Sequence, residues 1–363
     1  MAEKLRAGIL GVSGAAGQQF LAALDGHPQF EVAHVYGQSS AGKRLGEINR
    51  YVEFNPELLE MKIGEPKVDS DLDLVFSALP SEPARELEAM FAQEMPVLSV
   101  SSAYRYDEDC PILIPEVNEQ HAEIIQWQQM NRKWKGFIVP GPNCTVVPAA
   151  ITLKALHHFG IKKVFYTSYQ AVSGAGIGAL DKLILQESDP DAKEAKEGVM
   201  YAHNVIPYIK GEEEKVRKEL KKILGDFGEK ITPYSINVDG TCVRVPVKKG
   251  HTLVINVETE KSIDKKRAIS AFNGFNGYCS ELFGNLHSSP KNTVTVRQKQ
   301  DRPQPYFDAA LDGGMTTVVG RIRRSDIFEN GLQYVALSNN LMKGAAKGAV
   351  QVAEFLLRDG YLD

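Results

Sequence analysis

Cysteine is scarce in this sequence, and long apolar runs are missing altogether. The four cysteines among 363 residues, Cys110, Cys144, Cys242 and Cys279, lie far apart and form no CxxC pair. That spacing argues against a zinc site and against a disulfide framework, and it fits a reducing compartment. No apolar run approaches the roughly 20 residues that span a bilayer, and the start of the chain lacks the apolar core of a signal peptide. We therefore expect a cytoplasmic protein that holds no metal and does not cross a membrane.

An excess of positive charge is missing as well. The chain carries 42 Lys and Arg against 46 Asp and Glu, which gives a formal net charge of −4. Nucleic-acid-binding domains carry a basic patch or stripe, so we do not expect a nucleic acid as partner. Hydrophobic residues make up 43% of the chain and charged residues 24%, which is typical of a globular protein. A chain of this length is too long for one ordinary hydrophobic core, which predicts two domains.

The first 140 residues alternate between strand and helix patterns. A short apolar strand at residues 7–10 leads into the glycine-rich run GVSGAAG at 11–17. Apolar residues at helical spacing follow, and a second strand is expected at 30–36. Glycines between a first strand and a first helix let a pyrophosphate approach the backbone at the helix N-terminus. A tight turn without a ligand is the alternative, but the placement favours a dinucleotide-binding domain.

The end of the second strand indicates which dinucleotide is bound. NAD-binding domains usually carry an acidic residue there, which binds the ribose 2′-hydroxyl. This chain has the run GQSSAGKR at 37–44 instead. Hydroxyl groups and two cations suit a 2′-phosphate, so the sequence favours NADP over NAD; a solvated polar loop is the alternative. Further strands are expected at 72–78 and 96–100, and ligands of such sheets bind beyond the carboxyl ends of the strands.

The pattern changes after residue 144. A helix is expected to open at Glu212 and another to span 268–283, and the expected strands are 164–172, 242–247, 251–257, 316–323 and 332–337. A hairpin through 248–250 could join the strands on either side of it. We expect an antiparallel or mixed sheet with helices on one face. A last helix, from about 340 to 358, is expected to pack against the nucleotide-binding domain.

One cysteine stands in a setting that suits a nucleophile. Cys144 follows a Pro-Asn turn in the run GPNCTVVP at 141–148, directly before an apolar, alanine-rich stretch. This order predicts a thiol at the start of a helix, where backbone N–H groups and the helix dipole lower the pKa of a thiol. A buried cysteine with a packing role is the alternative that the turn alone leaves open.

Two further residues favour the catalytic interpretation. Arg244 and His251 flank a short connection, so their side chains can approach one site. A cysteine nucleophile usually works with a histidine base, and the fork-shaped guanidinium binds small anions well. A histidine taken alone is more often a surface or core residue. This one begins an apolar strand beside a glycine and close to an arginine, which favours a role in catalysis. Metal-binding spacing such as HExxH does not occur.

Several separated motifs make the chain resemble the aspartate-β-semialdehyde dehydrogenase family. They are PNCT at 142–145, SYQAVSGAG at 168–176, NVIPY at 204–208, DGTCVR at 239–244, GH at 250–251 and SNNLMKGAA at 338–346. The resemblance implies a reversible, NADP-dependent reductive dephosphorylation of L-4-aspartyl phosphate to L-aspartate 4-semialdehyde, in the biosynthesis of lysine, methionine and threonine. With the strand pattern it predicts an α/β fold: a Rossmann-like dinucleotide-binding domain with a mostly parallel sheet, and an α+β catalytic and dimerisation domain with a mixed sheet.

The resemblance implies that three residues carry out the chemistry. Cys144 would attack the acyl carbon and expel phosphate, which leaves a thioacyl enzyme, and hydride transfer would then give a thiohemiacetal that collapses to the aldehyde. His251 would be the general acid and base, since the pKa of a free histidine is about 6.5. Gln170 would hold the intermediate in place.

The same resemblance implies a set of substrate-binding residues. Arg244 would bind the carboxylate of the substrate and Glu212 its amino group, although Glu213 and Glu214 leave the register of that glutamate open. Lys215, three residues after Glu212 and so on the same helix face, would bind phosphate. Two further residues would help it, Arg105 and Asn143.

The cofactor-binding residues that the resemblance implies lie in four loops. They are Gly11, Ser13, Gly14, Ala15, Ala16, Ser39, Ser40, Lys43, Ser173, Gly174, Gly176 and Asn340. The expected NADP-binding domain comprises residues 1–143 with the C-terminal helix 340–363, and the catalytic and dimerisation domain comprises 144–339. Family members form homodimers or homotetramers through the sheet of the second domain, which predicts a homo-oligomer here.

Two related enzymes are the alternatives. N-acetyl-γ-glutamyl-phosphate reductases share the glycine loop and a catalytic cysteine, but they have Pro-Gly-Cys where this chain has Pro-Asn-Cys. Malonyl-CoA reductases of this type tend to lack the asparagine before the cysteine and the Glu–Lys pair. Asn143, Glu212 and Lys215 are present here, which favours the phosphorylated amino acid as substrate.

Overall fold

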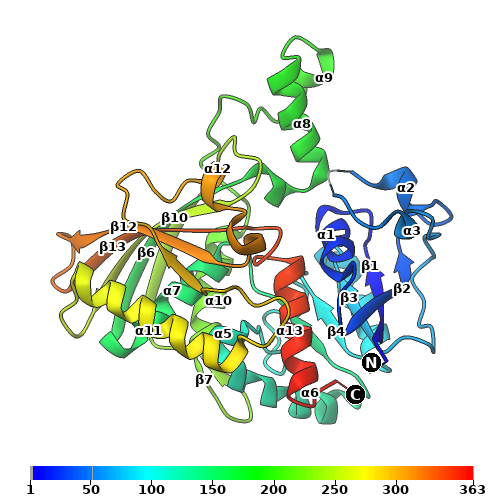
Figure 1. Ribbon diagram of the computed structural model, residues 1–363, viewed down its shortest axis with the longest axis horizontal. Helices are drawn as coiled ribbons and strands as arrows, with labels where there is room; N and C mark the ends of the chain where they lie inside the picture. The colour runs from blue at the N-terminus through cyan, green and yellow to red at the C-terminus, as the bar shows by residue number, and fades with distance from the viewer. Residues whose placement is uncertain (1–2, 51, 363) are drawn as a thin grey trace.

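Five parallel strands form the first sheet of the computed structural model (Figure 1), which describes residues 3–50 and 52–362. Positions 1, 2, 51 and 363 of the predicted domains lie outside these ranges. The sheet has the order β2-β1-β3-β4-β5, and its strands are β1 (Leu5–Leu10), β2 (Phe30–Tyr36), β3 (Leu74–Ser77), β4 (Val97–Ser99) and β5 (Ile138–Pro140). The four predicted strands are confirmed, each with ends within two residues of the prediction. The short strand β5 was not predicted.

Helices cover both faces of this sheet because its strands are apolar on both sides. Along β3, Leu74 and Phe76 belong to the core shared with α1 and α13, whereas Val75 packs in a second cluster with Phe91 of α4. Parallel strands buried on both faces are typical of doubly wound folds, so the Rossmann-like prediction is confirmed. The helices here are α1 (Ala15–Leu24), α2 (Leu45–Ile48), α3 (Pro56–Leu59), α4 (Ser81–Ala92), α5 (Pro115–Asn118), α6 (Ile124–Arg132) and α13 (Ala346–Arg358).

The second sheet is mixed, as predicted. Its order is β11-β12-β13-β10-β6-β9, with the pairs β6–β9 and β11–β12 parallel and the others antiparallel. The strands are β6 (Ile161–Gln170), β9 (Asn237–Arg244), β10 (His251–Thr259), β11 (Val294–Val296), β12 (Thr317–Ser325) and β13 (Gly331–Ser338). A separate two-stranded ribbon joins β7 (Asp226–Phe227) to β8 (Ile231–Thr232).

Helices pack on one face of the mixed sheet, which agrees with the prediction. Leu253, Ile255 and Val257 of β10 are fully buried in the core that α7 (Val146–Leu156), α10 (Glu212–Ile223) and α11 (Lys265–Phe283) share. The opposite face leaves aromatic side chains open, with Phe165 42% and Tyr169 40% exposed. The mixed sheet therefore has one packed face and one face with exposed aromatic groups.

The hairpin predicted through residues 248–250 is wrong. Strand β6 lies between β9 and β10, parallel to the first and antiparallel to the second. The connection instead crosses the end of β6, where the N–H of Val172 donates to Val247 O at 2.7 Å. The crossing brings the end of β9, the end of β6 and the start of β10 to one end of the sheet.

The last helix starts later than the sequence pattern predicts. Residues 340–345 form turns, and α13 begins at Ala346. Asn340 lies in this turn segment, and its Oδ1 accepts the N–H of Gly250 at 2.9 Å. The predicted packing of this helix on the nucleotide-binding domain is confirmed, because α13 lies against α1 and β4 (Figure 1).

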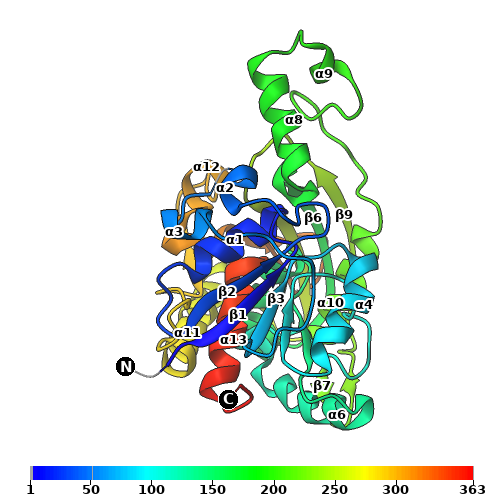
Figure 2. The ribbon, with the colours of Figure 1, turned by 90° about the vertical axis from the view of Figure 1, so that its right-hand side faces the viewer.

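A helical arm extends from the mixed-sheet half of the molecule. It consists of α8 (Ile177–Ser188) and α9 (Lys193–Lys196), which project beyond both sheets in the two orthogonal views (Figures 1 and 2). At its base, Arg50 donates to Asp181 at 2.7 Å and so connects the arm to the first half of the chain. Within the described ranges, none of the helices has the length and apolar character needed to cross a membrane.

Candidate active site

A cleft of about 350 Å³ opens where the carboxyl ends of the parallel strands face one end of the mixed sheet. Doubly wound sheets bind their ligands at this edge. Loops from both halves of the chain line the cleft, at residues 14–16, 78–81, 100–102, 142–144, 170–176 and 340–345. The cleft therefore collects the glycine loop, the turn before Cys144 and the strand ends of the second sheet in one place.

Cys144 lies at the start of a helix, as predicted. The turn before it is held by Asn143, whose Oδ1 accepts both the N–H of Thr145 at 2.9 Å and its hydroxyl at 2.6 Å. Helix α7 then begins at Val146. A Cβ on Gly344 would lie 3.0 Å from the Cβ of Cys144, so a glycine at that position lets the C-terminal segment approach the thiol closely.

His251 is the close partner of the thiol. Its Nε2 lies 3.1 Å from Cys144 Sγ, and its Nδ1 accepts the backbone N–H of Ala171 at 3.0 Å. An amide N–H only donates, so the neutral ring carries its proton on Nε2. That proton faces the sulfur. The ring is therefore arranged to donate a hydrogen bond to Cys144.

The pKa of the thiol is not lowered, contrary to the prediction from the helix N-terminus. Burial raises the pKa of Cys144 to about 12, and the charge of Glu212 adds to this. Burial and then the charge of Arg244 lower the pKa of His251 to about 3. Loss of water disfavours both charged forms more than the helix dipole favours the thiolate. The free protein therefore holds a neutral thiol beside a neutral imidazole.

This pairing predicts the pH dependence of alkylation in the free protein. With a thiol pKa of about 12, the thiolate fraction grows about tenfold for each pH unit between 7 and 9. The rate of carboxamidomethylation of Cys144 by iodoacetamide should rise by the same factor, without a plateau. Peptide mapping separates Cys144 from the other three cysteines, which are buried. A plateau near neutral pH, as a thiolate–imidazolium pair gives, would contradict this prediction.

Arg244 and Gln170 lie side by side at the ends of β9 and β6, where the two residues are in register. Arg244 is buried, and its Nη1 donates to Ala171 O at 2.7 Å. A Cβ on Gly174 would lie 2.9 Å from that Nη1 and 3.3 Å from the ring of His251. Gly174 thus leaves room for the guanidinium and the imidazole together.

Glu212 connects the polar residues of the cleft. Its Oε1 accepts from Lys215 at 2.8 Å, and its Oε2 accepts from Asn143 Nδ2 at 2.9 Å and from Gln170 Nε2 at 3.4 Å. Burial acts to raise the pKa of Glu212, but these three donors outweigh it and the net pKa is lowered. The carboxylate therefore stays charged at neutral pH in a part of the cleft that excludes most water.

The neighbouring glutamates point elsewhere. Glu213 accepts the backbone N–H of Cys242 at 3.2 Å, and Glu214 pairs with Lys218 at 2.6 Å on an exposed surface. The sequence leaves open which of the three glutamates faces the site. In this structure, Glu212 is the one that lines the cleft.

Arg105 lines the cleft but is already bonded. It is 5% exposed, and its guanidinium pairs with Glu219 at 3.1 Å. Three backbone carbonyls accept its other hydrogen bonds: Gly141, Val100 and Pro142. The predicted phosphate-binding residue is thus part of a buried network.

The predicted cofactor-binding residues divide into two groups. Seven line the cleft: Gly14, Ala15, Ala16, Ser173, Gly174, Gly176 and Asn340. The other five do not: Gly11, Ser13, Ser39, Ser40 and Lys43.

The second group follows the two loops beyond β1 and β2. The N–H of Gly11 donates to Tyr36 O at 3.0 Å, which holds those loops together. Ser39 and Lys43 are exposed, whereas Ser40 is buried, and its Oγ has no hydrogen-bond partner among the described residues.

The glycine loop has the features of a phosphate-binding site. Helix α1 begins at Ala15, and Gly14, its N-cap residue, offers no side-chain cap. The first N–H groups of such a helix lack partners within the helix and favour an anion. A Cβ on Gly17 would lie 2.3 Å from Gly11 O, so a glycine there allows the helix to start directly against the loop.

Several residues of the cleft carry no side-chain motif in the sequence. Leu341, Gly344 and Ala345 lie in a segment that the sequence pattern assigns to a helix, and so they gave no separate signal. The runs at 78–81 and 101–102 follow strands β3 and β4, at the strand ends where the sequence predicts ligand binding. Ala171 acts through its backbone, which no side-chain motif can indicate.

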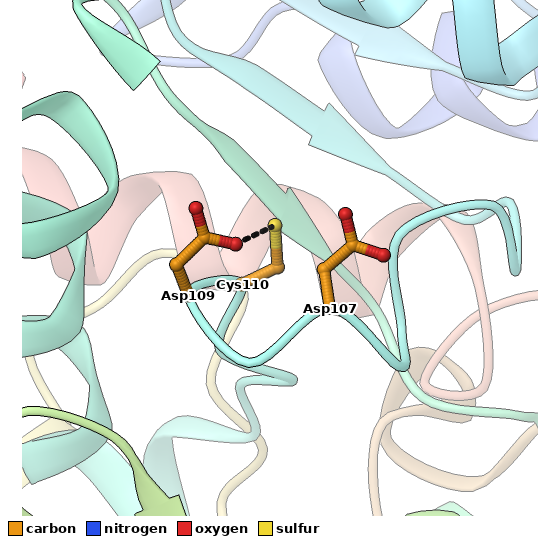
Figure 3. A group of neighbouring side chains, drawn as sticks. All are labelled: Asp107, Asp109 and Cys110. Atoms are coloured by element: carbon orange, nitrogen blue, oxygen red, sulfur yellow. Dashed lines mark hydrogen bonds between the residues drawn. The ribbon is translucent and has the colours of Figure 1, made fainter. Parts of the chain in front are cut away.

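A group of side chains whose types could bind a metal ion lies outside the cleft. Figure 3 shows Asp107, Asp109 and Cys110, whose candidate ligand atoms lie within 4.8 Å of one another. Both carboxylates are neutralised by Arg132, which binds Asp109 at 2.6 Å and Asp107 at 2.7 Å, and Arg85 binds the other oxygen of Asp107 at 2.9 Å. Because arginines already bind all four oxygens, this group stabilises a loop.

The fold and the cleft define a two-domain, nucleotide-dependent oxidoreductase with a cysteine–histidine pair. Two family models match the chain: the NAD binding domain of semialdehyde dehydrogenases over residues 6–125, and their dimerisation domain over residues 153–343. The chain belongs to the semialdehyde dehydrogenase family.

Named relatives extend over the full length. The chain is 38% identical to aspartate-semialdehyde dehydrogenase of Methanothermobacter thermautotrophicus, with 96% of this chain and 98% of the relative covered. It is 32% identical to malonyl CoA reductase (NADP) of Metallosphaera sedula, with 100% and 99% covered. Among solved structures, aspartate semialdehyde dehydrogenase with NADP from Candida albicans matches with a TM-score of 0.85 at 30% identity, over 99% of this chain and 100% of that chain.

Proposed function

We propose that the protein catalyses the reversible, NADP-dependent reductive dephosphorylation of L-4-aspartyl phosphate to L-aspartate 4-semialdehyde. The observation that carries this proposal is the contact of 3.1 Å between Cys144 Sγ and His251 Nε2 beside the polar network of Glu212. In the forward direction, the Cys144 thiol loses its proton, Sγ forms a C–S bond to the acyl carbon, the C–O bond to phosphate breaks, and phosphate leaves with that proton. The relatives named aspartate-semialdehyde dehydrogenase support this substrate.

Charge matching in the cleft supports the same substrate. Arg244, with one Nη bonded to Ala171 O, is oriented to bind the substrate carboxylate with the rest of its fork. Glu212 is a buried carboxylate suited to the amino group. Lys215 and Asn143 lie next to it and are suited to phosphate, and Arg105 adds positive charge behind them. Gln170 would hold the thioacyl group from the end of β6.

His251 acts in this proposal first as a neutral donor. Its Nε2–H supports the sulfur as a thiolate, and it stabilises the oxygen anion of the tetrahedral adduct when that oxygen takes the place near the ring. A neutral imidazole performs this kind of role in other enzymes. The general acid and base role passes through the charged ring, which burial and then the nearby charge of Arg244 oppose. A bound substrate carboxylate neutralises Arg244 and so lowers the free energy needed to form the charged ring of His251.

The cleft residues fit NADP. The chemistry that the bound cofactor would supply is the hydride: NADPH would give it to the thioacyl carbon, and NADP would take it from the thiohemiacetal carbon in the reverse direction. The uncapped start of α1 offers backbone N–H groups to the pyrophosphate. Ser39 and Lys43 are exposed beyond β2, where no acidic residue stands, and this suits a 2′-phosphate. Ser173, Gly174 and Asn340 would hold the nicotinamide end of the cofactor, since they line the cleft close to Cys144.

The rival substrate class is a coenzyme A thioester, because one relative is a malonyl CoA reductase. A malonyl group has no amino group for Glu212 to bind, and a thioester releases no phosphate. Asn143, Glu212 and Lys215 form one bonded network in the cleft, which favours the amino-acid substrate. The N-acetylglutamyl substrate likewise lacks a free amino group.

A comparison of substrates tests the proposal. The full-length protein is assayed in the oxidative direction with aspartate semialdehyde, phosphate and NADP, and NADPH is followed by its absorbance. We expect turnover that depends on phosphate and is much faster with NADP than with NAD. Activity only with malonyl-CoA, or only with the N-acetylglutamyl substrate, would show that the substrate is wrongly assigned.

Three further expectations stay proposals. We keep 1–143 with 340–363 as the NADP-binding domain and 144–339 as the catalytic and dimerisation domain. We propose a homodimer or homotetramer that forms through the open face of the mixed sheet, where Phe165 and Tyr169 are exposed. We propose the cytoplasm as the location, in keeping with a biosynthetic role.

A further inference from the structure

The buried face of α10 carries a carboxylate among apolar side chains. Val216, Leu220 and Ile223 are buried at helical spacing, and Glu219 lies on the same face with 0% exposure. A buried charge costs free energy unless it is paired and hydrogen-bonded. Even a paired one seldom stabilises a fold more than apolar residues of the same size would. Packing alone therefore does not explain a glutamate at this position.

Both oxygens of Glu219 are hydrogen-bonded to parts of the active site. Oε2 accepts the backbone N–H of Asn143 at 2.6 Å, and Oε1 accepts a hydrogen bond from Arg105 Nη1 at 3.1 Å. Asn143 directly precedes Cys144 in the chain. The carboxylate thus joins the turn that carries the thiol to a buried guanidinium.

Arg105 binds the same turn through two of its backbone carbonyls. Its Nε donates to Gly141 O at 2.8 Å, and its Nη2 donates to Pro142 O at 3.3 Å and to Val100 O at 2.9 Å. A guanidinium has five N–H groups, and these three bonds with the one to Glu219 use four of them. One N–H is left for an anion in the cleft. Two of the four hydrogen bonds of Arg105 therefore go to the turn.

We propose that Glu219 is a positioning residue of the reaction: together with Arg105 it forms a buried clamp on residues 141–143 that sets the place of Cys144 relative to His251. The turn is held at two points of α10, because Glu212 binds the side chain of Asn143 and Glu219 binds its backbone. This inference rests on the proposed function only in taking Cys144 as the nucleophile. It gives Arg105 a positioning role in addition to the phosphate contact proposed above.

Kinetics of Glu219→Gln give the first test. A glutamine has one acceptor oxygen and would turn an N–H group toward either the Asn143 N–H or the guanidinium. The turn should shift, and a displacement of about 1 Å lowers kcat about 10²-fold. KM for substrate and KM for phosphate should change less than about threefold. Glu214→Gln is the matched control, since Glu214 is an exposed glutamate of the same helix. An unchanged kcat in a folded Glu219→Gln protein would overturn the proposal.

A second measurement does not depend on activity or on the stability of that variant. The double variant Arg105→Met with Glu219→Leu replaces the clamp by apolar side chains. Folded proteins often tolerate the replacement of a buried ion pair by apolar residues of similar size. Iodoacetamide alkylation of Cys144 is measured with and without His251→Ala in both backgrounds. We expect His251→Ala to change the rate at least about fivefold in the natural background and less than about twofold in the double variant, because coupling requires contact.

Two outcomes of the alkylation measurement would overturn the clamp. One is an equal effect of His251→Ala in both backgrounds, and the other is no effect in either. If alkylation follows the expectation but aspartate semialdehyde is not turned over, the clamp stands and the proposed substrate fails. If the substrate is turned over and the coupling is unchanged, the function stands and the clamp fails.

Discussion

Replacement of Cys144 by serine is expected to lower turnover of aspartate semialdehyde at least about 10⁴-fold, because a hydroxyl in this setting is a far weaker nucleophile and leaving group. Sulfur lies 3.1 Å from His251 Nε2, and serine keeps this geometry with little change in volume. Binding of NADP should stay within about twofold, since serine nearly keeps the size of the side chain and Cys144 is not among the residues proposed to hold the cofactor. Steady-state kinetics and fluorescence titration with NADPH measure the two effects.

Cys279→Ser is the matched control for this prediction. Cys279 is a buried cysteine of α11, outside the cleft, so the same substitution there should leave turnover nearly unchanged. Loss of NADP binding together with turnover in the Cys144 variant would point to a structural cysteine. That result would favour the alternative from the sequence, in which Cys144 is a buried cysteine with a packing role.

Arg244→Lys is expected to lower kcat/KM for aspartate semialdehyde about 10²-fold, because a hydrogen bond to a charged group contributes about 1.5–3 kcal/mol and the lysine cannot reproduce those of the guanidinium. The lysine keeps the charge but has no planar fork to bind Ala171 O and a carboxylate together. The loss should appear mainly in KM, since the contact is present both before and during the reaction. KM for NADP should change much less.

Arg217→Lys is the control for Arg244→Lys. Arg217 pairs with Asp239 at 2.9 Å on the exposed side of α10, where the same substitution should have no measurable effect on kinetics. If Arg244→Lys and Arg217→Lys behaved alike, Arg244 would not bind the substrate carboxylate. A shorter substrate analogue without the carboxylate should be insensitive to Arg244→Lys.

The sequence predicts the parallel sheet well because its strands are short apolar runs with a glycine loop after the first. It does not predict the strand order of the second sheet. Residues 242–247 and 251–257 are close in sequence, so the local pattern predicts a hairpin between them. In the structure, β6 lies between β9 and β10 and pairs with both. Long-range pairing between β6 and β9 leaves no local signal. The correct placement of Arg244 and His251 at one end of the sheet did not depend on that hairpin.

Charged residues of the site were predicted by type more reliably than by role. Glu212 and Arg244 line the cleft as expected. The pKa of Cys144 was predicted in the wrong direction because the helix dipole is a local feature, whereas burial depends on the whole fold. Arg105 lines the cleft as expected, but its partner Glu219 lies 114 residues away in the chain and could not be inferred from spacing.

Trapping the acyl enzyme tests most directly that Cys144 is the nucleophile of this reaction. The full-length protein is mixed with aspartate semialdehyde and NADP in buffer without phosphate, quenched in acid and digested, and the cysteine peptides are examined by mass spectrometry. We predict an aspartyl thioester on the peptide that contains Cys144, formed together with about one equivalent of NADPH and discharged when phosphate is added. An unmodified Cys144 peptide during NADPH formation, or an aspartyl group on another cysteine, would contradict it.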